Sequence, residues 1–374
     1  MRIVYLADAP YIHTRRWVEH FAGSGCDVDV VSFRPAEIAG ARVHHVDGFE
    51  RLGRLRYLLQ ARRVRRLVRE LQPDVLHALH LTSYGFLAAM CGVRPTLTSV
   101  WGTDILEAPA WSPLHLFFTR YALAKADHVT ATGLHLASAT LRYAPRAKLV
   151  TVIPYGIDLA RFRPPARNGA TPNDVVIGSV ARLSREKGVD VLLAALAQLT
   201  ERRAPVRLVL AGDGPERARL ERLAGKLGIA ARVDFRGEVP HEQVPALLAQ
   251  LDVFALPSRA EGFGVAALEA AAMELPVVAS NVHGLPDVVE DGRSGLLVPP
   301  NDAGALAAAL ERLVADAGLR AEMGRAGRIL VERRYRWEEN TAQMERLYHH
   351  LRASFTQAVG HATVPKTNAG AGPA

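Results

Sequence analysis

The chain has 374 residues, 49% of them hydrophobic, and its 46 Lys and Arg against 38 Asp and Glu give a net charge of +8. This length and composition predict two globular domains with sizeable cores. Two cysteines exclude a disulfide framework, and we expect a cytoplasmic protein because there is no signal-peptide core and no apolar run of 18 residues.

The first part of the chain alternates short apolar runs with helical patterns. Strands are predicted at 2–7, 27–33, 74–79, 96–101, 127–131 and 148–153, and helices at 13–23, 52–71, 84–92, 114–125 and 134–143. Apolar strands separated by helices are typical of a parallel sheet covered on both faces. Residues 1–160 therefore predict a doubly wound, Rossmann-like α/β domain.

The excess positive charge lies in this first part. Residues 1–164 hold 21 Lys and Arg against 13 Asp and Glu, whereas the remaining residues hold 25 of each. Eight arginines fall within 51–71. That segment is either a basic face for anionic lipid or a phosphate-bearing acceptor, or a solvated helix face. Aromatic residues do not alternate with the arginines, so we expect no nucleic-acid partner.

Three histidines stand at predicted strand ends, where the ligands of wound sheets bind: His13, His77 and His80. Each is either an acid–base candidate or an ordinary packed or surface residue. Asp27 and Asp29 resemble a metal-binding pair, but they open a strand at the opposite edge, and we interpret them as structural. No other cluster has metal-ligand spacing.

The second part of the chain follows a proline-rich linker at 163–169 and repeats the alternation. Its strands are predicted at 174–180, 206–211, 232–236, 251–256, 276–280 and 295–298. Residues 161–336 therefore predict a second doubly wound, Rossmann-like α/β domain. Residues 353–374 are poor in large apolar side chains, and we expect them to be disordered.

Two cations follow the first strand of this second domain. Arg182 and Lys187 lie at its carboxyl end, just before the next helix. The helix dipole and free N–H groups would add to their charge, which suits a pyrophosphate. Ordinary loop solubility is the alternative.

Two carboxylates, Glu261 and Glu269, flank a glycine turn at the N-terminus of an apolar helix. Carboxylates there could accept hydrogen bonds from the vicinal hydroxyls of a sugar or ribose, or could serve only the helix dipole and a buried cap. The turn also fits the G-x-G-x-x-A dinucleotide fingerprint, but the next strand ends in Asn281 rather than an acid. That difference disfavours an NAD-linked oxidoreductase.

In this order and spacing, the motifs resemble those of retaining glycosyltransferases of the GT-B type, family 4. The resemblance covers nearly all of residues 1–352 and rests on segments 178–188, 211–215, 284–286 and 295–299, and on the E-x7-E spacing of Glu261 and Glu269. It implies an acceptor-binding and a donor-binding domain facing across a cleft. It also implies that a final helix, 337–352, packs back on the first domain.

The resemblance assigns roles on the donor side. Arg182 and Lys187 would hold the donor diphosphate, and Glu261 would contact the transferred sugar. Glu269 would bind the ribose hydroxyls. Backbone N–H groups of Gly262, Phe263, Gly264 and Val265 would help Glu261. The family needs no metal, and the nucleotide-sugar is a co-substrate rather than a cofactor.

The acceptor side departs from the family pattern. Many relatives carry a histidine before a Gly-x-Asp segment, and Trp101 stands at that position here, before Gly102 and Asp104. A tryptophan can stack on a sugar face but cannot move protons. His13, His77 or His80 could take that role, so these three histidines, Trp101 and Asp104 form the acceptor-side set.

We therefore expect a retaining hexosyltransferase that moves a sugar from a UDP- or GDP-sugar to a glycan or lipid-linked acceptor in cell-envelope or polysaccharide biosynthesis. Its basic first domain would suit an anionic inner membrane face. The alternatives are a non-catalytic nucleotide-sugar-binding homologue and a GT-B-like epimerase or phosphorylase.

Overall fold

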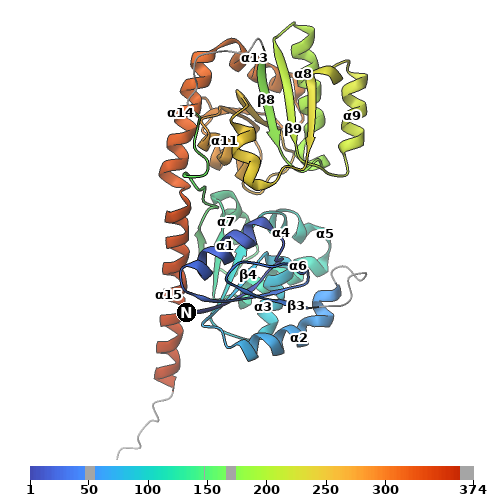
Figure 1. The fold of residues 1–374 in the computed structure, drawn as a ribbon. Helices are drawn as coiled ribbons and strands as arrows, with labels where there is room; N and C mark the ends of the chain where they lie inside the picture. Colours follow the sequence, from blue (N-terminus) through green and yellow to red (C-terminus); the bar gives the residue numbers. More distant parts are fainter. Residues whose placement is uncertain (47–54, 147, 166–173, 363–374) are drawn as a thin grey trace, which may run out of the picture.

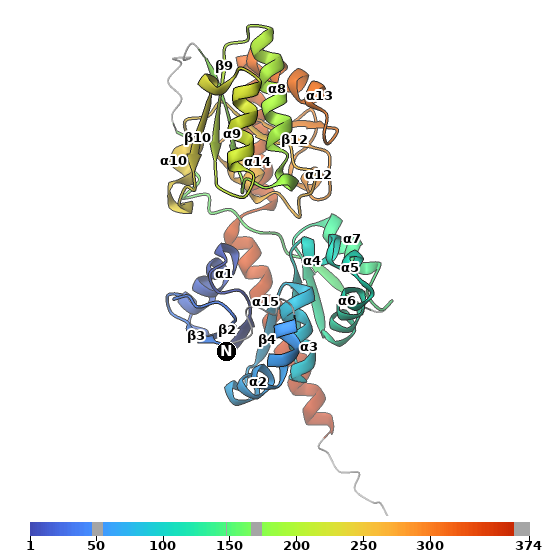
Figure 2. The same cartoon turned by 90° about the vertical axis from the view of Figure 1, so that its right-hand side faces the viewer.

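The computed structural model describes residues 1–46, 55–146, 148–165 and 174–362. Two α/β domains stand one above the other, and the last two helices run along one side of both (Figures 1 and 2). The predicted fold of two doubly wound domains is confirmed, because every strand pairing in both sheets is parallel and helices lie between the strands.

The first domain is built on a seven-stranded sheet in the order β3-β2-β1-β4-β5-β6-β7. Its strands are β1 (Arg2–Leu6), β2 (Asp27–Ser32), β3 (Arg42–His45), β4 (Val75–Leu79), β5 (Thr96–Val100), β6 (His128–Ala131) and β7 (Val150–Val152). The predicted strands lie within two residues of six of these. The sheet changes direction of growth between β1 and β4.

Helices cover both faces of this sheet. They are α1 (Ile12–Gly23), α2 (Leu55–Leu71), α3 (Phe86–Cys91), α4 (Thr103–Leu106), α5 (Ala108–Trp111), α6 (Pro113–Lys125) and α7 (Leu134–Leu141), and a π-turn spans Leu81–Gly85. Strand alternation sends Ile3 and Tyr5 toward α1, and Val4 and Leu6 toward α2 and α3. The first three residues predicted for the helix at 52–71 lie outside the described residues.

The sequence analysis missed β3, an edge strand of polar composition. Arg42 and His44 both point at the fully buried carboxylate of Asp29, at 2.7 Å each, and Arg42 also pairs with Asp27. These ion pairs confirm the structural interpretation of the two aspartates. They also explain why a strand without a large apolar side chain is stable at this edge.

The second domain has a six-stranded sheet in the order β10-β9-β8-β11-β12-β13. Its strands are β8 (Val175–Val180), β9 (Val206–Ala211), β10 (Val233–Gly237), β11 (Val253–Leu256), β12 (Val277–Ser280) and β13 (Gly295–Val298). Its helices are α8 (Val189–Glu201), α9 (Arg217–Lys226), α10 (Val244–Leu248), α11 (Val265–Ala272), α12 (Leu285–Val288), α13 (Ala303–Ala315) and α14 (Ala317–Arg334). Short 3-10 turns occupy Arg185–Lys187, Ala230–Arg232 and His241–Gln243.

Two segments cross between the domains, and they pair with each other. Ile157 donates its N–H to the Tyr335 carbonyl at 2.7 Å, and Trp337 donates to the Ile157 carbonyl at 3.1 Å. A β-carbon at Gly156 would lie 2.4 Å from the α-carbon of Trp337, so only glycine allows this approach. The crossing is therefore a tight two-stranded joint.

The chain ends in α15 (Trp337–Ala362), which packs on the first domain. Tyr348 is fully buried there, with its hydroxyl 2.9 Å from that of Tyr5. We expected disorder over 353–374, but the helix continues to Ala362, with Arg352 3.3 Å from Asp74 and Phe355 packed under Arg94. Residues 363–374 lie outside the described residues. Over the described part of the chain, no helix has an apolar stretch long enough to cross a bilayer.

Candidate active site

A cavity of about 590 Å³ lies between the two domains. In the first domain it is lined by residues at the carboxyl ends of β1 and β4, such as Asp8 and His80. In the second domain it is lined by residues at the carboxyl ends of β8 and β11, such as Ala181 and Leu256. In each sheet these two strands are the neighbours at which the direction of growth changes, and ligands of wound sheets bind at that point.

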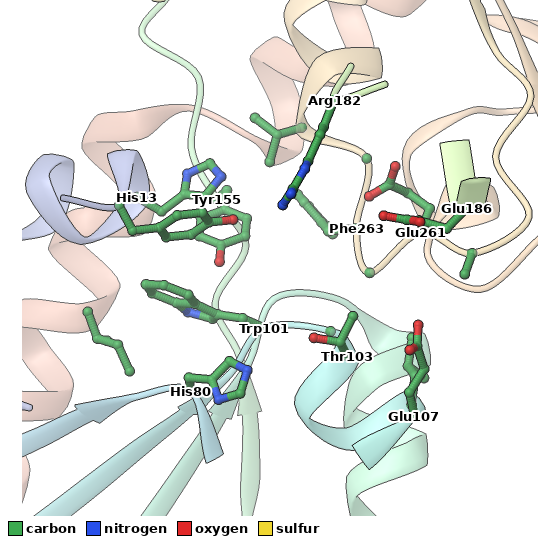
Figure 3. A pocket seen from close by; sticks show the side chains of 18 of the residues that line it. His13, His80, Trp101, Thr103, Glu107, Tyr155, Arg182, Glu186, Glu261 and Phe263 are labelled. Carbon is green, nitrogen blue, oxygen red and sulfur yellow. The ribbon is translucent and has the colours of Figure 1, made fainter. Parts of the chain in front are cut away.

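The loop after β8 carries Arg182, whose exposed side chain reaches down into the cavity (Figure 3). Two glycines after β9 support this loop. A β-carbon at Gly212 would lie 1.9 Å from the Ala181 carbonyl oxygen, and one at Gly214 would lie 2.4 Å from that of Leu183. Backbone packing against glycine therefore fixes the position of Arg182.

Lys187 and Glu261 form an ion pair in the cavity, with Nζ 2.8 Å from Oε2. Their side chains are only 22% and 14% exposed, so each charge has little water to replace its partner. An anionic group entering beside Lys187 would compete for the ammonium group and free Glu261 to accept hydrogen bonds from a ligand.

Arg259 holds the loops of this ion pair together, a role that the sequence analysis missed. Its guanidinium makes two hydrogen bonds to Asp190, at 2.8 and 3.0 Å, and a third to the Arg185 carbonyl at 2.7 Å. Its backbone N–H donates to the Glu186 carbonyl at 2.7 Å. The sequence signals that could have indicated this ion pair are an arginine two residues before Glu261 and an acid, Asp190, in the first turn of α8.

The glycine turn leads into α11 at the cavity wall. Gly264 has φ +95°, a left-handed conformation that glycine adopts without strain, and α11 begins at the next residue. The first N–H groups of a helix have no partner within it, so the backbone here can bind an anion or a hydroxyl. Gly262, Phe263, Gly264 and Val265 all line the cavity, as does Glu261.

Glu269 lies apart from this group. It is 5% exposed, does not line the large cavity, and its Oε1 lies 2.8 Å from Nε2 of His241. His241 itself lines a smaller cavity of about 250 Å³ on the side of the crossing segments, with Arg16 and Arg161. Of the two carboxylates of the E-x7-E spacing, only Glu261 thus lines the large cavity, whereas Glu269 is buried against a histidine that lines the smaller one.

An aromatic wall forms the opposite side of the large cavity. His13 stacks on Tyr155 with ring centroids 4.1 Å apart, and Trp101 lies 5.7 Å from Tyr155. His80 lines the same side, below Trp101, with its Nδ1 2.8 Å from Ser83 Oγ (Figure 3). Flat rings of this kind suit the apolar face of a sugar.

His13 is neutral at physiological pH. Burial, the Arg16 charge and His241 lower its pKa from 6.5 to about 3, and its Nδ1 is buried with no hydrogen-bond partner among the described residues. A group with this pKa is a hydrogen-bond partner rather than an effective base at neutral pH.

Two acceptor-side candidates do not reach the cavity. Asp104 is fully buried and accepts backbone N–H groups from Leu81 and Gly102, at 2.8 Å each, so it fixes the loop that carries Trp101. His77 is 1% exposed and lies inside β4, with Nδ1 2.6 Å from the Tyr348 hydroxyl. Strand alternation turns His77 toward α15 and away from the cavity.

The buried imidazole of His77 should make the protein sensitive to acid. Burial lowers its folded-state pKa to about 3, against 6.5 as the ordinary value. Between these values the unfolded chain binds a proton that the folded chain does not. Stability is therefore complete above about pH 6.5 and falls as the pH drops toward 3, by up to about 1.4 kcal/mol per pH unit.

Urea unfolding of the wild type and His77→Gln at several pH values between 7.5 and 5 measures this contribution. We expect the variant to lose less stability on acidification, whatever its stability at pH 7.5. The other histidines with a lowered pKa, His13, His20, His128 and His135, are present in both proteins, so their contributions cancel. If the free energy of unfolding changed equally with pH in the two proteins, His77 would not be a source of the acid sensitivity.

No three His, Cys, Asp or Glu side chains within the described ranges are grouped so that they could hold a metal ion. The cations that face the cavity from the donor domain are Arg182 and Lys187. With the N-terminus of α11 they form a positive corner beside Glu261. This arrangement can bind a diphosphate and stabilise negative charge that develops on it.

Two family models match the chain. The model described as glycosyl transferases group 1 matches residues 162–330, and the one described as glycosyl transferase 4-like matches residues 2–133. The chain is 34% identical over 310 residues to the GDP-mannose-dependent alpha-(1-6)-phosphatidylinositol monomannoside mannosyltransferase of Mycolicibacterium smegmatis, covering 77% of this chain and 79% of the relative. It is 38% identical over 280 residues to the D-inositol 3-phosphate glycosyltransferase of Streptomyces avermitilis, covering 68% and 60%.

Solved structures resemble the whole chain. Sucrose-phosphate synthase from Thermosynechococcus elongatus superposes with a TM-score of 0.82 at 25% identity, over 95% of this chain and all of that one. The HepE protein of Anabaena, in complex with UDP-glucose, superposes with a TM-score of 0.77 at 23% identity, over 94% and 100% of the two chains.

Proposed function

Because the chain belongs to the glycosyl transferases group 1 family, with the GT-B fold, we propose that it is a retaining hexosyltransferase. It moves a sugar from a UDP- or GDP-linked donor to a glycan or lipid-linked acceptor in cell-envelope or polysaccharide biosynthesis. The observation that carries this proposal is the convergence of Arg182, Lys187, Glu261 and the start of α11 on one cavity between the domains.

Each part of that corner fits one part of a nucleotide-sugar. Arg182, Lys187 and the N–H groups before α11 bind the diphosphate, and Glu261, released from Lys187, binds hydroxyls of the transferred sugar. Glu269 lies outside this corner, and in the proposal it binds the ribose after exchanging its hydrogen bond with His241. The relative from Mycolicibacterium smegmatis is named as GDP-mannose-dependent, so GDP-mannose is the first donor to test.

Retention of configuration follows from attack on the face that the diphosphate leaves. The acceptor oxygen bonds to the anomeric carbon as the bond from that carbon to the phosphate oxygen breaks. The acceptor proton passes to the departing phosphate, whose growing charge Arg182 and Lys187 stabilise. The low pKa of His13, which makes it a weak base, and the tryptophan at position 101 support this route, because it asks no side chain to take the proton.

Nucleotide binding can be tested by thermal unfolding with GDP, UDP, ADP and NAD. A ligand at a hundred times its dissociation constant stabilises the fold by about 2.7 kcal/mol, which is a measurable shift. We expect GDP or UDP to shift the wild type, and Glu269→Ala to lose that shift. The matched control is Glu242→Ala, an exposed acid next to His241, which should respond like the wild type.

The donor that corresponds to the shifting nucleotide is then offered with glycan and lipid acceptors. Transfer with the same anomeric configuration as the donor supports the proposal in full. A nucleotide that binds without any transfer would favour the non-catalytic homologue. A shift by NAD alone, or by none of the four, would contradict the donor site.

A further inference from the structure

Helix α7 of the first domain begins directly after a glycine, Gly133. The first N–H groups of a helix have no partner within it, and an Asp, Asn or Ser side chain at the position before the helix commonly accepts one of them. Glycine has no side chain with which to do this. The start of α7 therefore needs an acceptor from elsewhere in the molecule.

That acceptor comes from the donor domain. The carboxylate of Asp287, in α12, accepts the backbone N–H of His135, with Oδ2 3.2 Å from the nitrogen. His135 is the second residue of α7, one of the positions whose N–H a capping side chain usually accepts. Figure 2 shows α12 and α7 facing each other where the two domains meet. Asp287 is thus a helix cap supplied across the domain boundary.

Gly133 makes room for this carboxylate. A β-carbon at Gly133 would lie 2.8 Å from Oδ2 of Asp287 and 3.3 Å from Cδ2 of Phe263. The φ of Gly133 is −156°, an extended conformation that any residue can adopt, so the backbone itself does not require glycine. The close approach of the donor domain is what requires a glycine before α7.

The cap is a hydrogen bond to the backbone rather than an ion pair with the histidine ring. Burial and His283, whose ring lies 5.4 Å away, lower the pKa of His135 by more than Asp287 raises it. The ring of His135 is therefore neutral at physiological pH. The charge of Asp287 acts instead on the start of α7, where the helix dipole favours an anion.

Asp287 is tied to the part of the donor domain that lines the large cavity. Its carbonyl accepts the hydroxyl of Tyr335 at 2.5 Å, and the ring of Tyr335 lies 5.8 Å from that of Phe263. Gly284, just before α12, packs on the glycine turn, since a β-carbon there would lie 2.4 Å from the Gly262 carbonyl oxygen. The cap and the glycine turn therefore form one packed unit.

We propose that Asp287 is a positioning residue, which fixes the donor domain against the first domain by capping α7. The cap exists only while the domains are as close as they are here. Its free energy therefore favours the arrangement in which the glycine turn meets Trp101 and Gly102 and the two sides of the cavity keep a fixed spacing. The inference rests on the proposed function for the transfer step, whereas the cap itself does not.

Hydrogen exchange of the full chain tests the cap without any substrate. We expect the amide of His135 to exchange about tenfold faster in Asp287→Ala and in Gly133→Ala, because the first removes the carboxylate and the second displaces it. Asp287→Asn should keep the wild-type rate, because asparagine caps as well as aspartate. The matched control is Asp316→Ala, which removes the cap of α14 inside the donor domain and should leave His135 unchanged.

A double variant separates positioning from helix stability. Gly133→Ser combined with Asp287→Ala gives α7 a cap from its own chain. We expect it to recover slow exchange at His135, while its kcat for transfer stays about tenfold below the wild type, as in Asp287→Ala alone. The nucleotide-induced thermal shift should remain in both, because the proposed nucleotide-binding groups belong to the donor domain.

Unchanged exchange of His135 in Asp287→Ala would show that no cap crosses the domains. Recovery of kcat in the double variant, or an equal loss in Asp316→Ala, would show that stability rather than position matters, and would overturn the proposal. If the wild type transfers no sugar from any donor, the proposed function fails and small-angle X-ray scattering decides this inference alone. Asp287→Ala should then have a larger radius of gyration than Asp287→Asn, and equal radii would reject the positioning role.

Discussion

Replacing Arg182 by alanine should lower kcat/KM for sugar transfer by about 10²- to 10³-fold, the usual loss when one preorganised group that stabilises developing charge is removed. Arg182 reaches into the cavity from a loop whose backbone is fixed by the packing of Gly212 and Gly214, so its charge is preorganised there. Lys187 is partly neutralised by Glu261 until the donor arrives. On the proposed function, a departing diphosphate would therefore depend on Arg182 from the outset.

Steady-state kinetics with the donor varied and the acceptor saturating measure this loss. Arg185→Ala is the matched control, because it removes an exposed arginine three residues along the same loop that does not line the cavity. A loss of less than about fivefold for Arg182→Ala, or equal losses for the two variants, would show that transition-state charge is stabilised elsewhere.

Replacing Gly102 by alanine should lower kcat strongly while leaving nucleotide binding nearly unchanged. Gly102 has φ +149°, and a β-carbon there would lie 3.1 Å from the α-carbon of Gly262 in the other domain. The domains thus meet glycine against glycine beside Glu261 and Trp101. An added methyl group would hold them apart at the reacting centre, where about 1 Å of misplacement can cost 10²-fold in rate.

The measurement compares kcat for transfer with the dissociation constant for the nucleotide that shifts the wild type. Gly25→Ala controls for backbone strain, because Gly25 also has a left-handed φ, of +84°, but a β-carbon there would meet nothing within 4 Å. If Gly25→Ala lowers kcat as much as Gly102→Ala, loss of stability rather than domain approach explains the effect.

The fold could be predicted from the sequence because parallel strands buried on both faces appear as continuous apolar runs. β3 could not, since its stability comes from Asp29 and its two partners rather than from an apolar pattern. Arg42 and His44 follow Asp29 by 13 and 15 residues, and only the pairing of β3 beside β2 brings them to its carboxylate.

The donor side of the site was more predictable than the acceptor side. Arg182, Lys187 and Glu261 directly follow strands of one domain, and strand ends on one edge meet wherever the helices lie. His77 and His80 show the limit, because they are three residues apart yet one is buried and the other lines the cavity. His77 lies within β4, where alternation turns it toward Tyr348 of α15, whereas His80 lies just past the end of the strand.

Helix α15 limits how the donor domain can be exchanged between related proteins. Since segments of the first domain both precede and follow the donor domain, the donor domain is inserted between two joints, Ile157 and Trp337. A single crossover in the linker would separate Tyr348 from Tyr5 and His77 and open the core beneath β1 and β4. Exchange of donor specificity between relatives therefore requires both joints to be cut together, with α15 left on the acceptor domain that it completes.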